Sequence, residues 1–114
     1  YGIEIPLHSR TLGLAGTADL FCKWDGEPTI VDFKTSRRKK KKEWIENYFL
    51  QGTAYAMMAR EMYNTDIYQI VIIIANPEDS YPQTFIENPE NWKEKLLTMK
   101  SEYDSINSVN RRLF

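Results

Sequence analysis

The sequence predicts a mixed α/β domain of the α+β kind, in which a central sheet of about five strands is flanked by helices. Three observations predict it: an Asp-Gly pair between two β-rich runs, a helical repeat of apolar residues over residues 42–63, and an unbroken apolar run over residues 67–75. The first is a strong hairpin signal, and the last is typical of a strand buried on both faces. The elements follow in the order strand, strand, strand, helix, strand, strand, helix.

The first three strands are expected at residues 2–9, 14–24 and 27–35. The first alternates loosely between apolar and polar side chains, and a turn separates it from the second. Asp25 and Gly26 form the two-residue turn between the second and third strands, which should therefore pair antiparallel.

The second half of the chain begins with the helix at residues 42–63. Its apolar residues recur at spacings of three and four on two adjoining stripes, so this helix should be largely buried. Strands are expected at residues 67–75 and 81–87. The last helix, at residues 90–107, follows Pro89, a residue that suits the first turn of a helix, and its apolar stripe consists of Trp92, Leu96, Met99 and Tyr103.

The composition is that of an ordinary globular domain. The length of 114 residues fits one domain, and the hydrophobic share is 42%. No apolar run approaches the ~20 residues of a membrane span, and no signal peptide is visible. The single cysteine, Cys22, excludes an internal disulfide and a four-cysteine metal site built by this chain alone. It is compatible with an intracellular, reducing compartment.

The positive charge is concentrated in one segment. Fifteen basic residues face sixteen acidic ones, but six of the basic residues occupy the consecutive positions 37–42. Without this run, nine basic residues would remain against the sixteen acidic ones. Such a run is commonly a solvated loop or a localisation signal. Its place directly after the third strand, beside the carboxylates described next, favours a role in holding phosphate.

The hairpin turn determines which residues of the second and third strands face each other. A two-residue turn at residues 25–26 places Asp19 opposite Asp32, at a non-hydrogen-bonded pair where Cβ atoms lie ~4.5–5.5 Å apart. Carboxylates so close repel, unless a shared proton, a cation or full solvation offsets the repulsion. A divalent metal ion fits best, since Mg²⁺ is held by one or two carboxylates with water and phosphate. A slip of one residue would instead place the two aspartates on opposite faces.

Lys34 lies two residues after Asp32 and should share its face, since alternate strand residues point the same way. An ammonium group there can orient the attacking water or stabilise charge on a phosphate. With a metal ion, these groups suit phosphodiester hydrolysis. An Asp-x-Lys sequence on a strand is also common on an exposed, salt-bridged face, so the geometry alone leaves both interpretations open.

Gln51 and Tyr55 are four residues apart on the predicted helix and therefore share one face. The residues around them are small, and Gly52 within a helix costs ~1 kcal/mol relative to Ala. A close approach to the sheet or to a substrate backbone would explain the glycine. A purely structural interpretation puts Tyr55 in the core and gives Gln51 no role.

Three motifs follow one another in the order and spacing of a known nuclease class. They are Gly16-Thr17-Ala18-Asp19, Val31-Asp32-Phe33-Lys34-Thr35-Ser36 and Gln51-Gly52-Thr53-Ala54-Tyr55. They resemble the G-x-x-D, D-x-K-T and Q-x-x-x-Y motifs of RecB-like PD-(D/E)XK nucleases, and are similar to those of the mitochondrial genome maintenance exonuclease family and its phage and bacterial relatives. The resemblance covers most of the chain.

This resemblance implies a restriction-endonuclease-like PD-(D/E)XK core that cuts DNA, commonly from single-stranded ends, with Mg²⁺ or Mn²⁺. The metal ligands would be Asp19, Asp32 and the backbone carbonyl of Phe33. Lys34 would be the catalytic lysine, with Gln51 and Tyr55 supporting the site or contacting the DNA backbone. The substrate-binding residues at the mouth of the site would be Thr35, Ser36, Arg37, Arg38, Lys39 and Lys40.

One feature of the resembling family is missing. Its members usually carry a further His or Glu on a helix upstream of the first strand, so residues 1–114 are expected to form a single nuclease core without that helical part. Glu4 is a weak substitute, since a strand Glu is more often solvated, and His8 is more simply a surface residue. Cas4-type relatives are disfavoured, because their iron–sulfur cluster needs cysteines that this chain lacks.

Two interpretations from other classes stay open. One is a non-catalytic nucleic-acid-binding module with the same fold, in which the basic run grips phosphates and aromatic residues stack on bases. The other is a structural or assembly domain with a solvated basic loop. Asp19, Asp32 and Lys34 together favour the nuclease, because a degenerate nuclease would tolerate the loss of at least one. The predicted function is a metal-dependent DNA exonuclease of replication, recombination or repair.

Overall fold

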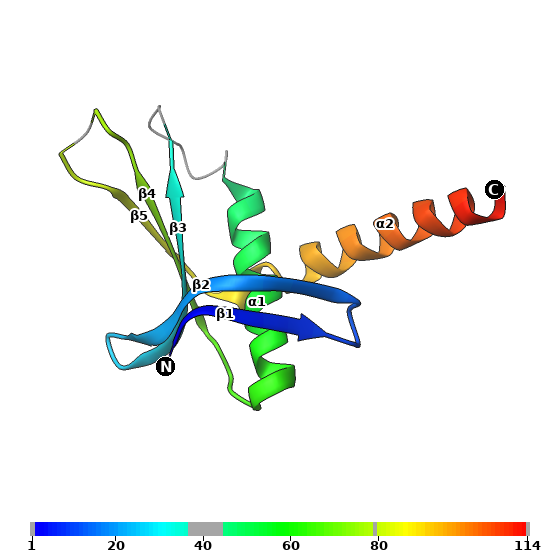
Figure 1. Cartoon of the computed structure of the whole chain (residues 1–114), viewed down its shortest axis with the longest axis horizontal. Coiled ribbons are helices and arrows are strands. Elements are labelled where there is room, and N and C mark those ends of the chain that lie inside the picture. Colours follow the sequence, from blue (N-terminus) through cyan, green and yellow to red (C-terminus); the bar gives the residue numbers. More distant parts are fainter. Residues whose placement is uncertain (1, 37–44, 79, 114) are drawn as a thin grey trace.

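The computed structural model of the chain describes residues 2–36, 45–78 and 80–113, with side chains up to residue 106. Five strands form one sheet in the order β1-β2-β3-β4-β5, and the helices lie to one side of it (Figure 1). The predicted mixed sheet flanked by helices is confirmed. The elements are β1 (Gly2–Ser9), β2 (Leu14–Trp24), β3 (Glu27–Thr35), α1 (Glu46–Tyr63), β4 (Gln69–Ala75), β5 (Gln83–Glu87), the 3₁₀ turn η2 (Pro89–Asn91) and α2 (Lys93–Leu113).

The first three strands have the predicted bounds, and the later elements differ by a few residues. α1 begins at Glu46, with Ile45 as its N-cap residue, instead of at residue 42. β4 and β5 each begin two residues later than predicted; proline has no N–H to donate, and Pro82 precedes β5 instead of lying within it. α2 begins only at Lys93, because Pro89 starts a separate 3₁₀ turn whose N-cap, Asn88, accepts a hydrogen bond from the Glu90 amide.

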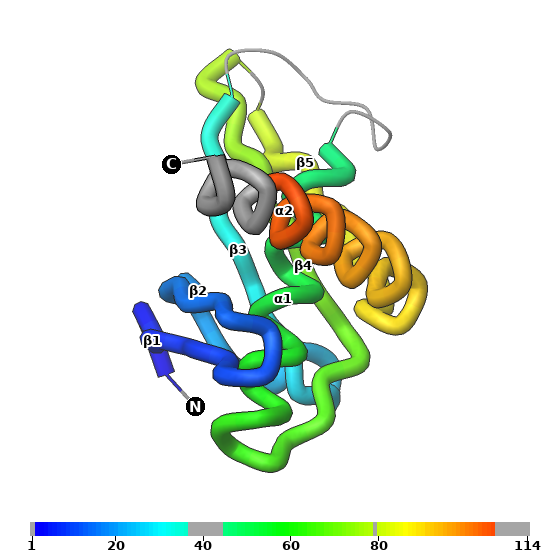
Figure 2. The backbone as a smooth tube through the Cα atoms, turned by 90° about the vertical axis from the view of Figure 1, so that its right-hand side faces the viewer, coloured from blue at the N-terminus to red at the C-terminus, as the bar shows by residue number. Residues whose placement is uncertain are grey.

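α1 connects the parallel pair β3–β4 and packs against one face of the sheet (Figure 2). Phe49 and Ile70 are fully buried in this layer. The helix approaches the sheet closely at Gly52, where a Cβ atom would lie 2.5 Å from Cγ2 of Ile70. The predicted close approach is therefore confirmed, and it is made to a strand of the sheet.

Beyond the part of β2 that pairs with β3, the β1–β2 hairpin bends away from the other strands and crosses α1 (Figure 1). The pairing of β2 with β3 has the predicted register but ends at Leu20–Val31, one pair before Asp19–Asp32. At the same level β1 has a left-handed residue, Glu4 (φ 51°), and its pairing with β2 skips that position. The bend in the hairpin thus occurs beside Asp19.

A carboxylate on α1 holds the far end of this hairpin. Glu61 accepts hydrogen bonds from the Ser9 hydroxyl, the Arg10 amide at 3.0 Å and the Thr11 amide at 3.4 Å. These bonds lower the pKa of Glu61, the Ser9 hydroxyl most of all. The hairpin that carries Asp19 is therefore fastened to the helix that carries Gln51.

The predicted apolar stripe of the last helix is buried only at its start. Trp92, which precedes α2, stacks on Phe49 with ring centroids 5.2 Å apart, and Leu96 packs against the core. Met99 and Tyr103 are 43% and 61% exposed, because α2 runs outward from the body of the domain (Figure 1). In the described part of the chain, no helix is long and apolar enough to cross a membrane.

Candidate active site

Asp19 lies at the point where β2 separates from β3. Its Oδ2 accepts a hydrogen bond of 2.9 Å from the Phe33 amide. The expected ladder pair between Asp19 and Asp32 is absent because the hairpin has already turned away, but the two carboxyl groups still share a hydrogen bond. The expectation that they are neighbours is confirmed.

Lys34 lies on the same face of β3 as Asp32, as predicted. Its Nζ is 2.9 Å from Asp32 Oδ2 and donates a hydrogen bond of 2.9 Å to Gln51 Oε1. The side chain of Asp32 is 6% exposed, whereas that of Lys34 is 25% exposed. The ammonium group therefore lies between a buried carboxylate and solvent.

Gln51 and Tyr55 continue this chain of polar contacts along α1. Gln51 Nε2 donates to the Tyr55 hydroxyl at 3.0 Å, which directs Oε1 of the same amide toward Lys34. Tyr55 in turn packs on Gly16 of β2, where an added Cβ would lie 2.7 Å from the Tyr55 ring. All three sequence motifs thus meet at one place.

Tyr48 also belongs to this group, although the sequence analysis did not single it out as a site residue. The Lys34 ammonium lies over its ring, 5.1 Å from the ring centroid, within the range of a cation–π contact. Tyr48 precedes Gln51 by three residues and so shares its side of the helix. The three-residue spacing from Gln51 is the feature of the sequence that could have identified Tyr48 as a site residue.

The two aspartates have pKa values displaced in opposite directions. The pKa of Asp32 is raised to about 6, first by burial and then by the hydrogen bond with Asp19, while Lys34 acts against both. The same hydrogen bond lowers the pKa of Asp19, with help from the Phe33 amide and the Lys34 charge. Asp32 therefore keeps its proton to a higher pH than an ordinary aspartate, and Asp19 loses its proton at a lower one.

The donor set fits a hard divalent metal ion. Oδ2 of Asp32 is a buried oxygen whose contact in the described part of the chain is the Lys34 ammonium at 2.9 Å. Two carboxylates and a backbone carbonyl leave room for the water and phosphate ligands that Mg²⁺ keeps. Among the described residues, no three His, Cys, Asp or Glu side chains come together as a metal site.

The remaining candidates are Glu4, the two residues after Lys34 and the start of the basic run. Glu4 is exposed and does not complete a three-carboxylate group in the described part of the chain. Thr35 is exposed at the end of β3, and the Ser36 amide donates to the Ala75 carbonyl at 2.9 Å. Arg37, Arg38, Lys39 and Lys40 lie outside the described residues.

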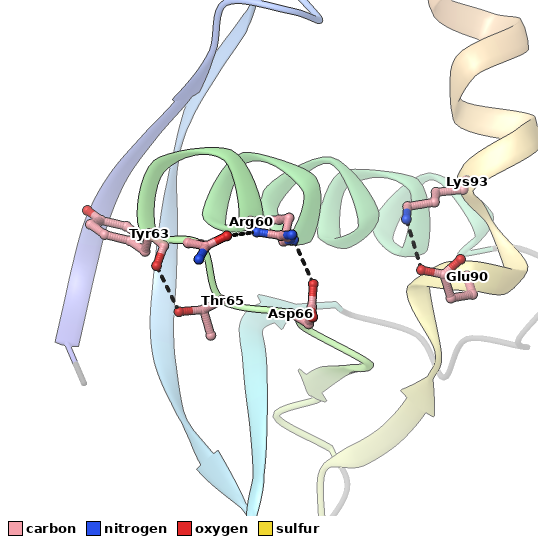
Figure 3. A network of polar contacts seen from close by, with 7 residues as sticks. Arg60, Tyr63, Thr65, Asp66, Glu90 and Lys93 are labelled. Carbon is pink, nitrogen blue, oxygen red and sulfur yellow. Dashed lines mark hydrogen bonds and ion pairs between the residues drawn. The ribbon is translucent and has the colours of Figure 1, made fainter.

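Two further ion pairs lie beside α1, one at its C-terminal end and one at the start of α2 (Figure 3). Arg60 Nε is 2.7 Å from Asp66 Oδ1, and Lys93 Nζ is 2.9 Å from Glu90 Oε1. They border a cavity of about 160 Å³ beside Tyr68. Each of these cations has its own carboxylate, and all four side chains are about half exposed, so these contacts are ordinary surface ion pairs.

Comparison with known proteins agrees with the motifs. A search of curated proteins found no match to the chain. The sequence model of the PD-(D/E)XK nuclease superfamily matches residues 1–110, which include every element that contributes to the site. Nucleases of this superfamily generally use divalent metal ions and act on nucleic acid. With its mixed sheet, its aspartate pair and the lysine beside them, this chain belongs to the PD-(D/E)XK nuclease superfamily.

Proposed function

We propose that this protein is a metal-dependent DNA exonuclease of the RecB-like kind, which hydrolyses phosphodiester bonds from single-stranded ends in replication, recombination or repair. The observation that carries the proposal is the contact of Asp19 and Lys34 with the buried carboxyl group of Asp32. The exonuclease activity and the single-stranded substrate rest on the resemblance of the three motifs to those of RecB-like enzymes. An intracellular location is part of the same proposal.

Asp19, Asp32 and the Phe33 carbonyl would hold Mg²⁺ or Mn²⁺. Such an ion polarises the phosphate and lowers the pKa of bound water. Lys34 would place its positive charge against the phosphate undergoing attack, where it stabilises the developing negative charge. Gln51 keeps the ammonium group in place through its 2.9 Å hydrogen bond, and Tyr55 orients the Gln51 amide.

The substrate backbone would enter beside the end of β3. Thr35 and Ser36 follow Lys34 directly, and the basic residues Arg37, Arg38, Lys39 and Lys40 come next in the chain. Contacts from hydroxyl and basic groups to phosphates hold a strand without reading its bases. This fits an enzyme that acts on DNA of any sequence.

The test is a cleavage assay on end-labelled single-stranded, double-stranded and closed circular DNA, and on RNA, with Mg²⁺, Mn²⁺ or EDTA. We expect metal-dependent release of nucleotides from single-stranded DNA and no cutting of the circle. Asp32→Asn should abolish cleavage while DNA binding is kept, because it removes a ligand charge and no DNA contact. Cleavage by Asp32→Asn at the wild-type rate would refute the two-aspartate site.

Asp66→Asn serves as the matched control, since it removes one carboxylate at the opposite end of α1. It should leave both cleavage and binding unchanged. The alternative, a non-catalytic nucleic-acid-binding module, predicts binding without metal-dependent cleavage by any variant, the wild type included.

A further inference from the structure

We propose that Tyr48 is a positioning residue for the Lys34 ammonium group, an inference that rests on the nuclease function proposed above. The ammonium lies over the Tyr48 ring at 5.1 Å from its centroid. A cation over the face of an aromatic ring within about 6 Å is attracted by the ring quadrupole, more strongly where water is partly excluded. Lys34 is in that situation, with its side chain 25% exposed.

The ammonium group has three partners from two elements. Asp32 of β3 lies 2.9 Å away on one side, and Gln51 of α1 accepts a hydrogen bond of 2.9 Å on another. Tyr48 of α1 covers a third side. A lysine side chain has many rotamers of similar energy, so a partner on each side is what keeps Nζ at one position.

The contribution of Tyr48 to holding Lys34 should be largest when Asp32 also binds a metal ion. An Asp32 oxygen that is shared with a metal ion holds the ammonium less strongly than one that faces Lys34 alone. Gln51 and Tyr48 then become the main contacts that keep Lys34 aimed at the phosphate. Gln51 has its own support in Tyr55, whereas the ring of Tyr48 is held by packing against the cluster that contains Ile45 and Phe49.

The position of the ring argues against the other role open to a tyrosine near DNA, which is stacking on a base. Base stacking needs a free ring face. The ring of Tyr48 is partly buried, with one face under the ammonium and a packing contact with the core cluster. Its contact with the substrate is therefore made through Lys34.

The first test compares Tyr48→Phe and Tyr48→Leu in steady-state cleavage by the full chain with Mg²⁺. Phe keeps the ring, so Tyr48→Phe should retain activity close to the wild type. Leu keeps the apolar packing but has no ring, so Tyr48→Leu should lower kcat by roughly 3- to 10-fold with little change in KM. Tyr63→Leu, at the other end of the same helix, removes an exposed ring and should change neither constant. A rise in KM with constant kcat, or equal losses in Phe and Leu variants, would overturn the proposal.

The second test does not depend on cleavage. In the metal-free protein, ¹⁵Nζ relaxation of Lys34 reports how firmly the ammonium is held. We expect Tyr48→Phe to match the wild type and Tyr48→Leu to show a clear gain in Nζ mobility. Unchanged mobility in Tyr48→Leu would refute the contact even if cleavage falls. If wild-type protein cleaves nothing, the proposed function fails, and this measurement still decides whether Tyr48 holds Lys34.

Discussion

The carboxylate of Asp19 accepts a hydrogen bond from the amide of Phe33, at the level where the ladder between β2 and β3 ends. The side chain thereby takes the place of a backbone acceptor and joins the two strands as they diverge. Asp19 therefore has a structural contact in addition to its proposed part in metal binding.

Two substitutions of Asp19 should separate these roles. Asp19→Asn keeps an oxygen that can accept from Phe33, whereas Asp19→Ala leaves that amide without its acceptor. We expect Asp19→Ala to have a free energy of unfolding about 0.5–1.5 kcal/mol below that of Asp19→Asn, and faster amide exchange at Phe33. Both variants should lose metal-dependent cleavage. Equal stability and equal exchange in urea unfolding and NMR would show that the hydrogen bond contributes nothing.

The stability of the metal-free protein should fall as pH rises from about 4 to about 6. The pKa of Asp32 is raised to about 6 in the folded protein, so the folded state keeps a proton that the unfolded state has already released. A pKa shift of this size changes the free energy of unfolding by at most about 3 kcal/mol. The lowered pKa of Asp19 acts in the opposite direction, and only below its ordinary value of 3.8.

Urea unfolding in EDTA from pH 3 to pH 8 measures this dependence. Asn cannot ionise, so in Asp32→Asn the free energy of unfolding should no longer fall between pH 4 and 6. Its fall at more acidic pH should remain. Added Mg²⁺ should stabilise the wild type at pH 7 more than at pH 5, since binding requires the ionised carboxylate. A wild-type curve parallel to that of Asp32→Asn would contradict the assignment of this proton to Asp32.

The sequence was sufficient for the parts of the site that depend on local rules. The two-residue turn at residues 25–26 defines the register of β2 with β3, and strand alternation puts Lys34 beside Asp32. The end of the ladder at Leu20 could not be foreseen, because it depends on contacts between the hairpin and α1, among them those of Glu61. Tyr48 was missed for a similar reason. Its spacing from Gln51 indicates a shared side of the helix, but only the packed structure shows that Lys34 lies over its ring.

Gly16→Ala should destabilise the protein through the Tyr55 ring. The new Cβ would lie 2.7 Å from Cε1 of Tyr55 and 3.2 Å from its hydroxyl. Overpacking of this kind costs about 1–3 kcal/mol, and a displaced Tyr55 would no longer orient Gln51, so activity should fall as well. Tyr55→Leu in the Gly16→Ala background should recover much of the stability in urea unfolding but not the activity. Additive losses in the double variant would show that the two residues do not interact.

The basic run at residues 37–42 is expected to hold DNA at the mouth of the site. The run itself lies outside the described residues, which resume at Ile45 after ending at Ser36. Ser36 is tied to β4 through the Ala75 carbonyl, and Ile45 is buried at the start of α1. Lys34 and Gln51, which lie near these two ends, are hydrogen-bonded to each other. The described residues before and after the run thus belong to the two elements, β3 and α1, that carry the proposed site.

Replacing Lys39, Lys40, Lys41 and Lys42 with Ser should weaken binding to every DNA sequence alike. Each phosphate neutralised on single-stranded DNA contributes about −0.7 to the slope of log K against log salt, so two to four lost contacts should change that slope by roughly 1.5–3. The metal requirement should not change, because no proposed metal ligand is altered. Replacing Lys93, Lys95 and Lys100 with Ser removes charge from α2 instead and should leave the slope nearly intact. Binding isotherms at several salt concentrations measure both variants. A solvated loop or localisation signal would leave affinity and slope as they are in the wild type, and that result would exclude this segment from the DNA path.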